Sequence, residues 1–221
     1  MIYYLIPARK NSKGFPGKNR KLLSFTLDNI PEENKSSVIV STDDEFIVDF
    51  VKNKHHKVKI HRRSDAVSSD IASPKDIVVE VTKDFKMRPD DEIITMYLTY
   101  PERKHEDVEK IYKFFKSHNG SSLLCASNPD FHPYRAYYAL EGYRGKKVVE
   151  HDLHRRQDYP KCFIANHFVS IIKVEYVNAI DENLYHPQTI FYHLDKHTID
   201  IDTEKDLEKF KKGNVIKCIQ K

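Results

Sequence analysis

A run of cations and small residues follows the first apolar segment of the chain. Residues 6–19 read IPARKNSKGFPGKN, with Arg9, Lys10, Lys13 and Lys18 as the cations. If this run leaves the carboxyl end of a buried strand, its backbone N–H groups and cationic side chains can surround a polyphosphate. The G-K-[ST] ending of a Walker A loop is missing, so two interpretations stay open: a phosphate-binding loop and an ordinary basic surface loop.

Two carboxylates in the last part of the chain could complement these cations. In Asp200-Ile201-Asp202, a strand would direct both carboxylates to one side and Ile201 into the core. Two carboxylates together with phosphate oxygens suit Mg²⁺, which usually retains several waters. Alternatively, Asp202 only favours the N-terminus of the next helix. The residue types leave both interpretations open.

Regular elements must position these groups, and strand-like runs alternate with helix-like ones along the chain. The alternation predicts an α/β domain with a mostly parallel sheet and helices on both faces. The predicted strands cover 2–6, 37–41, 57–60, 92–97, 123–126 and 168–173, with a strand end at 198–202. The predicted helices cover 45–52, 73–85 and 106–116, followed by a last helix that begins after 203 and stops at 212–213.

Two of these helices carry clear start signals. Ser73 has the features of an N-cap, with Pro74 at the first helical position. Thr203 and Asp206 have the spacing of a capping box that opens the last helix. The pattern changes after residue 128, because residues from about 130 to 165 are rich in Tyr, Arg and His and lack a long helical period. We therefore expect one domain over 1–221 with a smaller lobe inserted at about 130–165.

Composition narrows the class of protein. The chain has 221 residues, enough for one well-buried domain, and its net charge of +4 comes from many charges of both signs. It lacks the one-sided basic stripe that nucleic-acid binding requires. The apolar start at 1–6 is too short for a signal peptide or a membrane span, and three widely spaced cysteines predict reduced thiols. We expect a cytoplasmic protein that binds neither nucleic acid nor membranes.

Taken together, the motifs resemble those of the CMP-sugar synthetases, the acylneuraminate cytidylyltransferase family. The opening motif of that family, I-P-A-R-x-x-S-K-x-x-P-x-K-N, is matched from Ile6 to Asn19. Five further motifs keep the family's order over nearly the whole chain. They are S-T-D at 41–43, R-x5-S-D-x-A-S at 63–73, H-P-x-K as HPYR at 132–135, R-Q-x-L-P as RQDYP at 156–160, and D-I-D-T at 200–203.

The resemblance implies a Rossmann-like, three-layer nucleotidyltransferase domain with a small dimerisation lobe, working as a homodimer. It also implies a reaction. CMP would pass from CTP to the anomeric hydroxyl of an acidic 2-keto sugar of the sialic acid kind, with Mg²⁺ as cofactor and pyrophosphate as the leaving group. Such a transfer depends mainly on alignment and on neutralising the developing charge.

The resemblance also assigns residues to the two halves of the site. On the nucleotide side, it implies that CTP is held by Ala8, Arg9, Ser12, Lys18, Asn19, Arg63 and Ser69. Among these, the backbone near Ala8, together with Arg63 and Ser69, would read cytosine. Catalysis would use Arg9, Lys18, Asp200 and Asp202, of which the two aspartates would bind Mg²⁺. On the sugar side, it implies contacts from Tyr97, Thr99, Arg135, Arg156 and Gln157.

The sugar side departs from the family pattern. The family's Q-P-T-S-P-L-R loop reads YLTYPER at 97–103, so Tyr97 replaces a glutamine and Tyr100 a serine. We expect these rings and Glu102 to reshape the sugar pocket. N-G-A-I-Y appears as NHFVS at 166–170. The nucleotide-side motifs are kept, whereas the sugar-side motifs differ from the family pattern. Legionaminate-like, pseudaminate-like and Kdo-like sugars therefore stay open as acceptors beside N-acetylneuraminate.

Two other functions compete with this one. A nucleotidyltransferase for a phosphonate or a sugar phosphate would not need Arg135 and Arg156, which suit a carboxylate because an arginine donates two parallel hydrogen bonds to it. A nucleotide-binding pseudoenzyme would not need the pair Asp200 and Asp202. The presence of all four residues favours the enzyme that acts on an acidic sugar.

Overall fold

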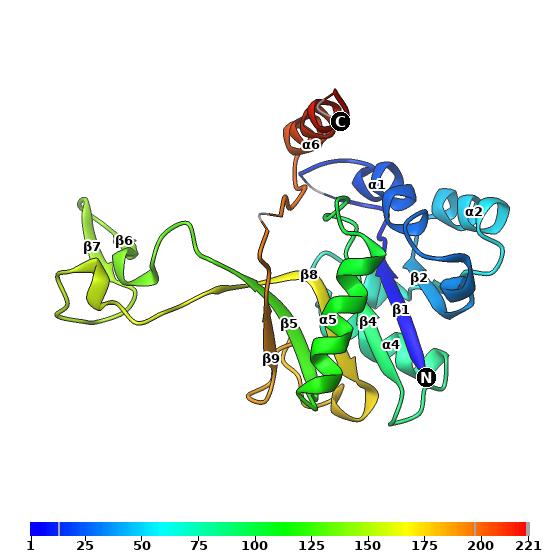
Figure 1. Cartoon of the computed structure of the whole chain (residues 1–221), viewed down its shortest axis with the longest axis horizontal. Coiled ribbons are helices and arrows are strands. Elements are labelled where there is room, and N and C mark those ends of the chain that lie inside the picture. Colours follow the sequence, from blue (N-terminus) through cyan, green and yellow to red (C-terminus); the bar gives the residue numbers. More distant parts are fainter. Residues whose placement is uncertain (13, 197, 220–221) are drawn as a thin grey trace.

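The computed structural model describes residues 1–12, 14–196 and 198–219, with side chains up to residue 212. Its centre is a seven-stranded sheet in the order β3-β2-β1-β4-β8-β5-β9 (Figure 1). The strands are β1 Ile2–Pro7, β2 Val38–Thr42, β3 Lys59–Arg62, β4 Glu92–Thr95, β5 Ser122–Ser127, β8 Ile164–Lys173 and β9 Ile190–His193. β8 runs antiparallel to both of its neighbours and the other pairs are parallel. The predicted mostly parallel sheet is confirmed.

Helices cover both faces of this sheet, and the strand residues alternate between the two faces. Ile6 and Ile94 pack into one apolar cluster with α1, α2, α5 and α6, whereas Leu5 and Ile93 pack into a second cluster with α4. The helices are α1 Lys18–Leu27, α2 Glu45–Lys54, α3 Asp65–Ser68, α4 Pro74–Asp84, α5 His105–Ser117 and α6 Glu204–Ile219, with short 3-10 turns at Glu32–Ser37, Pro133–Arg135, Arg156–Asp158 and Val174–Tyr176. The structure confirms the three-layer α/β domain.

Helix α1 is an element that the sequence reading did not predict. It lacks a side-chain N-cap, and Gly17 enters it in the left-handed region with φ 70°. Its first turn carries cations and no acid, which is unfavourable next to the positive end of a helix dipole. Long-range ion pairs compensate: Arg20 pairs with Asp44 at 2.6 Å, and Lys21 pairs with Glu204 at 3.0 Å.

Two predictions for the last part of the chain are wrong. Residues 198–202 form no strand, because the N–H groups of Ile199 and Ile201 donate to the loop after β4 instead of to a neighbouring strand. Helix α6 continues past Gly213 to Ile219, since a glycine inside a helix costs about 1 kcal/mol relative to alanine and does not force an end. The capping box of Thr203 and Asp206 is present, and so is the one at Ser73. Strand β9, with four residues at the edge of the sheet, was not predicted.

The strand order places a topological switch beside β1. From β1 the chain continues to β2 and β3 on one side, and it then crosses to β4 on the other side. The loops that follow β1 and β4 therefore leave the sheet side by side at its carboxyl edge. In open α/β sheets this is the position where ligands bind.

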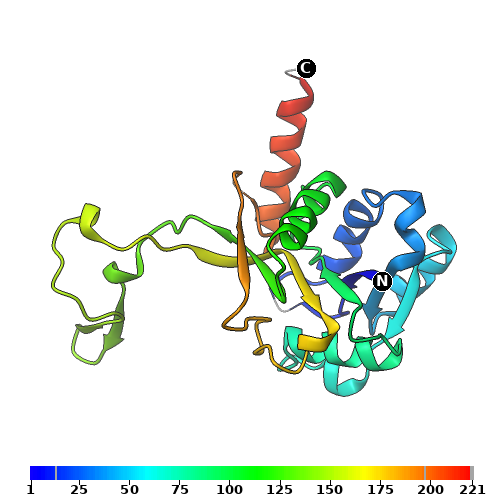
Figure 2. The same ribbon diagram turned by 60° about the horizontal axis from the view of Figure 1, so that its bottom comes forward.

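The segment between β5 and β8, residues 128–163, projects away from the domain (Figure 1). It contains a two-stranded hairpin, β6 Tyr137–Leu140 and β7 Arg144–Lys147, and it corresponds to the lobe expected at about 130–165. A small cluster of rings forms its interior, in which Tyr134 stacks on His151 with ring centroids 4.3 Å apart. Helix α6 also extends outward, as Figure 2 shows. Within the described residues, no helix has both the length and the apolar character that crossing a bilayer requires.

Candidate active site

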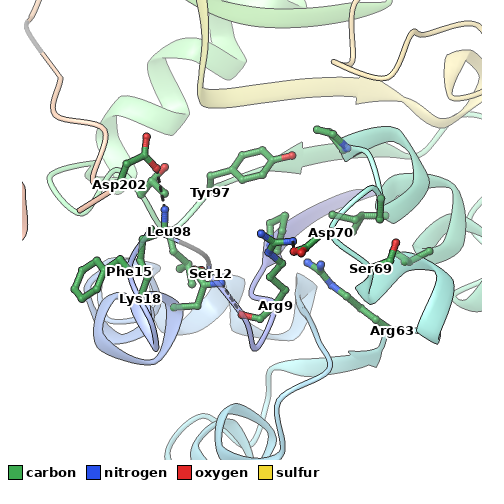
Figure 3. Close-up of a pocket in the computed structure, with 18 residues that line it drawn as sticks. Arg9, Ser12, Phe15, Lys18, Arg63, Ser69, Asp70, Tyr97, Leu98 and Asp202 are labelled. Atoms are coloured by element: carbon green, nitrogen blue, oxygen red, sulfur yellow. Dashed lines mark hydrogen bonds and ion pairs between the residues drawn. The ribbon is translucent and has the colours of Figure 1, made fainter. Parts of the chain in front are cut away.

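A cleft of about 510 Å³ lies at the switch point (Figure 3). Its walls come from the loop after β1, the start of α1, the segment from the end of β3 to α4, the loop after β4, and the segment before α6. The lining residues are Pro7, Arg9, Ser12, Gly14, Phe15, Lys18, Asn19, Arg63, Val67, Ser69, Asp70, Ala72, Pro74, Ile77, Tyr97, Leu98, Thr99 and Asp202. Nine of them were predicted as site residues from the sequence: Arg9, Ser12, Lys18, Asn19, Arg63, Ser69, Tyr97, Thr99 and Asp202.

The loop after β1 is folded back on itself at one wall of the cleft. The side-chain amide of Asn19 donates to the backbone oxygen of Arg9 at 2.8 Å, which ties the start of α1 to the start of the loop. The backbone N–H of Lys10 donates to Asp43 at 2.7 Å. Lys13, which belongs to the predicted motif, lies outside the described residues. Among the two interpretations of this loop, phosphate binding fits the geometry, because cations and the N-terminus of α1 meet at one cavity.

The two predicted catalytic cations are each held by a carboxylate. Arg9 Nη1 lies 3.0 Å from Asp70 Oδ1, and Lys18 Nζ lies 3.0 Å from Asp202 Oδ1. The Lys18 side chain is 13% exposed and that of Asp202 is 73% exposed, so the lysine is fixed between protein walls while the carboxylate meets solvent. The cations are thus positioned before any anion arrives, which reduces the cost of ordering them on binding.

Arg63 enters the cleft from the end of β3. Its Nε donates to Ser41 Oγ at 3.0 Å and to the Ser41 backbone oxygen at 3.2 Å, while Figure 3 shows its guanidinium pointing toward Arg9 and Asp70. Burial lowers the pKa of Arg63 to about 10, so the guanidinium keeps its charge at neutral pH. Ser69 Oγ donates to the backbone oxygen of Ala66 at 2.8 Å, at the end of α3.

The backbone of Ala8 serves the fold. Its N–H donates to the backbone oxygen of Ser41 at 2.8 Å, and its oxygen accepts from the Thr42 hydroxyl. Ala8 is fully buried and does not line the cleft, whereas its neighbours Pro7 and Arg9 do. Any contact between this part of the backbone and a base therefore comes from the neighbours.

The loop after β4 divides its side chains between the cleft and the segment before α6. Tyr97 and Thr99 line the cleft, and the Tyr97 ring packs against His167 with centroids 5.2 Å apart. Tyr100 and Glu102 do not line it: the Tyr100 hydroxyl donates to Asp200 at 2.9 Å, and Glu102 accepts from the N–H of Ile199 at 3.0 Å. Of the groups expected to reshape the sugar pocket, only Tyr97 is in the cleft.

A buried arginine holds this loop against the sheet. Arg103 donates to the backbone oxygen of Phe168 at 2.6 Å and to that of Tyr97 at 2.8 Å. Its side chain is almost completely buried, and burial lowers its pKa to about 10. Arg103, which belongs to the family motif, therefore holds the backbone of Tyr97 in place and does not line the cavity.

The two predicted metal ligands differ in position. Asp202 lines the cleft and Asp200 does not, although both are exposed and separated by the buried Ile201. The cap of α6 is formed by Thr203 and Asp206, so the Asp202 side chain has Lys18 as its partner and takes no part in the cap. No cluster of three or more His, Cys, Asp or Glu suited to a metal occurs among the described residues, so a cation here would need phosphate oxygens to complete its shell.

Three predicted sugar-binding residues lie outside the cleft of their own chain. Arg135, Arg156 and Gln157 are exposed on the projecting segment 128–163. None of them lines the cleft. A role for them at a cleft requires a second copy of the chain or a different placement of the projecting segment.

The apolar part of the cleft wall and one of its acids were not predicted from the sequence. Phe15, Val67, Ile77 and Leu98 line the cavity, and such residues look in a sequence like any others of the core. Asp70 stood inside the S-D-x-A-S motif, and its ion pair with Arg9 gives it a place that the motif alone did not indicate.

Known proteins resemble this chain in sequence. The family described as "Cytidylyltransferase" matches residues 3–125. The N-acylneuraminate cytidylyltransferase of Streptococcus agalactiae serotype V is 26% identical over 91% of this chain and 50% of its own length. The pseudaminic acid cytidylyltransferase of Campylobacter jejuni subsp. jejuni serotype O:2 is 25% identical over 92% of both chains. The chain thus spans about half the length of the streptococcal relative and nearly all of the Campylobacter one.

Solved structures share the fold. The structure of CMP:2-keto-3-deoxy-manno-octonic acid synthetase complexed with CTP superposes with a TM-score of 0.67, at 15% identity, over 98% of this chain and 99% of that one. The 4-diphosphocytidyl-2C-methyl-D-erythritol synthase of Anaerococcus prevotii gives a TM-score of 0.61, at 13% identity, over 95% and 93%. The family match covers more than half of the chain, and the fold agrees with it. The chain belongs to the cytidylyltransferase family.

Proposed function

We propose that this protein transfers CMP from CTP to a hydroxyl of an acidic 2-keto sugar and releases pyrophosphate. The observation that carries the proposal is the pairing of Lys18 with Asp202 at 3.0 Å, in a cleft that Arg9 and Arg63 also line. Cations for a triphosphate and a carboxylate for a metal meet there at the switch point of the sheet. The relatives named for N-acylneuraminate and pseudaminic acid support the acidic sugar as acceptor class.

The positioned cations account for the nucleotide half of the reaction. Arg9 and Lys18 come from opposite ends of one loop, and both face the cavity. When the acceptor hydroxyl attacks the α-phosphorus, negative charge accumulates on the pyrophosphate that leaves, and fixed cations stabilise it without reorganising. Arg63 lies farther along the cleft, where its guanidinium can donate to the acceptor atoms of cytosine.

Magnesium fits the remaining groups. Asp202 in the cleft, with Asp200 two residues before it, would hold Mg²⁺ together with phosphate oxygens of CTP, since Mg²⁺ takes one or two carboxylates beside substrate phosphates. When bound, the ion would neutralise phosphate charge as a Lewis acid. The ammonium group of Lys18 would then lie near two negative groups, the carboxylate of Asp202 and a phosphate of CTP.

The projecting segment supports a homodimer as the working form. Its apolar side chains are unusually exposed for a single chain, since Tyr143 has no protein cover at all and Tyr137 is 60% exposed. The same segment carries Arg135 and Arg156, which are exposed and do not line the cleft of their own chain. We propose that a second copy covers these rings and that each projecting segment presents its arginines to the carboxylate of the sugar in the partner's cleft.

The test is pyrophosphate release with each of four nucleoside triphosphates, Mg²⁺ and a panel of 2-keto acid sugars. The proposal expects release with CTP and with one or two acidic sugars only. Pyrophosphate release with a sugar phosphate or a phosphonate, and with no sugar that carries a carboxylate, would show that the acceptor is not an acidic sugar. Binding of CTP without turnover of any acceptor would overturn the enzymatic function.

A further inference from the structure

A buried histidine connects Arg63 in the cleft with a carboxylate on the outside of the domain. His61, in β3, is 2% exposed. Its Nδ1 lies 3.0 Å from Ser41 Oγ, and its Nε2 lies 3.1 Å from Asp84 Oδ2 at the end of α4. Ser41 Oγ in turn accepts from Arg63 Nε at 3.0 Å. Four side chains thus form one continuous chain of contacts from the cleft to α4.

The acceptors around His61 fix the direction of this chain. Nε2 faces Asp84 and also Glu80, whose Oε2 lies 3.6 Å away, and a carboxylate can only accept. We infer from these negative charges that the proton of the neutral imidazole is on Nε2, which leaves Nδ1 as an acceptor for the Ser41 hydroxyl. Ser41 Oγ keeps its lone pairs for Arg63. Hydrogen bonds thus run from Arg63 to Ser41 and from Ser41 to His61, and bonds aligned in this way strengthen one another. Nε2 makes no hydrogen bond among the described residues, and the carboxylates of Asp84 and Glu80 act on it as nearby negative charges.

The surroundings of His61 keep the imidazole neutral. Burial lowers the pKa of His61, and the charge of Arg63 lowers it further, while Glu80 and Asp84 act in the opposite direction and do not cancel the effect of burial. The Phe85 ring, with its centroid 6.4 Å from that of the histidine, covers another side. A neutral ring is the form that the donor chain requires.

We propose that His61 is a positioning residue for nucleotide binding: through Ser41 it fixes the guanidinium of Arg63 in the cleft. The inference rests on the proposed function, which assigns Arg63 to the nucleotide. The backbone near Arg63 is held separately, because its N–H donates to the backbone oxygen of Thr42 at 3.2 Å. Loss of the histidine should therefore loosen the side chain of Arg63, which keeps its bond to the Ser41 backbone oxygen at 3.2 Å, while the strand remains in place.

Two substitutions of His61 separate positioning from packing. His61→Asn retains a side-chain acceptor that can reach the Ser41 hydroxyl, whereas His61→Leu removes it. We expect His61→Leu to weaken CTP binding about threefold to tenfold, the effect of one hydrogen bond between neutral groups, and to leave the KM of the acceptor sugar unchanged. His61→Asn should recover most of the lost CTP affinity. Isothermal titration calorimetry gives the affinity for CTP, and steady-state kinetics give the KM of the acceptor sugar.

Asp84→Ala supplies a variant at an exposed position that does not disturb the core. The Asp84 side chain is 55% exposed, so its removal leaves the fold intact, and Asp49→Ala on α2 is the matched loss of an exposed carboxylate outside the chain of contacts. We expect Asp84→Ala to weaken CTP binding and Asp49→Ala to leave it unchanged. Combined with Arg63→Lys, which removes the Nε donor, His61→Leu should cause little further loss, because coupled positions are not additive.

A measurement without nucleotide tests the same chain of contacts. Long-range ¹H–¹⁵N correlation spectra of the free protein should show His61 with its proton on Nε2 and a bare Nδ1 at neutral pH. A proton on Nδ1, or full affinity for CTP in both His61→Leu and Asp84→Ala, would overturn the inference. Additive losses in His61→Leu with Arg63→Lys would do the same. Failure of the proposed function would be seen separately, in a wild-type protein that does not bind CTP although His61 has the predicted tautomer.

Discussion

The hydroxyl of Tyr100 lies 2.9 Å from Oδ2 of Asp200, and this hydrogen bond joins the loop after β4 to the acidic segment before α6. Two more bonds run beside it, from the N–H of Ile201 to the oxygen of Thr99 at 2.9 Å and from the N–H of Ile199 to Glu102 at 3.0 Å. The acidic segment therefore owes its position to the loop, although it forms no strand. Burial raises the pKa of Tyr100, so its hydroxyl remains a donor through neutral pH.

Removing the Tyr100 hydroxyl tests whether this bond positions the acids. We expect Tyr100→Phe to lower the free energy of unfolding by about 1 kcal/mol and kcat by about tenfold, and to raise the Mg²⁺ concentration needed for half-maximal rate. Tyr112→Phe is the control, because it removes a half-buried hydroxyl that donates to Glu92 on the other side of the domain. Equal effects of the two changes on the Mg²⁺ dependence would show that Tyr100 only stabilises the fold.

Because of the buried carboxyl group of Glu102, we expect the free energy of unfolding to depend on pH in an unusual way. Burial raises the pKa of Glu102 above the 4.5 of an exposed glutamate, so the folded state favours the protonated form. The stability from this group is present below about pH 4.5 and is lost as the pH rises through the raised pKa of the folded state. We expect Glu102→Gln, which keeps an acceptor for Ile199, to be more stable than wild type at neutral pH. Urea unfolding at several pH values should show the gain shrinking toward acid; a gain that is constant with pH would contradict the assignment.

Substitutions of Lys18 and Lys21 distinguish a catalytic cation from a structural one. Lys18→Met should lower kcat about 100-fold, the usual cost of removing a fixed group that stabilises transition-state charge. Lys21→Met removes a neighbouring cation of α1 that pairs with Glu204 at 3.0 Å and does not line the cleft. We expect its kcat to remain within about twofold of wild type, because this exposed ion pair lies outside the cleft. Comparable losses in both variants would remove Lys18 from catalysis.

Mixing of two impaired variants, at a sugar concentration well below the raised KM, tests the exchange of arginines between copies. Arg156→Ala should raise the KM of the sugar much more than that of CTP, and Arg155→Ala, which disrupts a local pair with Asp158, should affect neither. A dimer with one Lys18→Met copy and one Arg156→Ala copy would join an intact cleft to an intact projecting segment. Activity should therefore return when the two proteins are mixed and exchange subunits. Absence of any recovery in verified mixed dimers would place the arginines elsewhere.

The sequence was sufficient for the class of fold and for nine of the residues that line the cleft. Apolar runs such as residues 2–6 and 92–97 indicate buried parallel strands. In an open α/β sheet, ligands bind at the loops that follow the strands on either side of a switch point. Arg9 and Lys18 stood out as cations after a buried strand and Asp202 as one of two carboxylates, but the residue types left other interpretations open for each of them. The motifs shared with the family, and not the spacing alone, singled them out as site residues.

The remaining features depend on contacts between distant residues. Helix α1 has no start signal, and it is supported by ion pairs from Arg20 and Lys21 to residues far along the chain. The acidic segment alternates as a strand would, yet it pairs with a loop. Tyr100 would fit a sugar pocket in the sequence pattern, but its hydroxyl donates to Asp200. Periodicity reports which side of an element is apolar and carries no information on such partners.

The most direct test of the account is the identity of the product. Wild-type protein would be incubated with CTP, Mg²⁺ and the acidic sugar that gives the fastest release of pyrophosphate, and the mixture followed by ³¹P NMR and mass spectrometry. We predict a phosphodiester of CMP with the sugar and an equal amount of pyrophosphate, and neither product with Lys18→Met over the same period. Conversion of CTP to CDP and phosphate, or a product that retains the pyrophosphate, would contradict it.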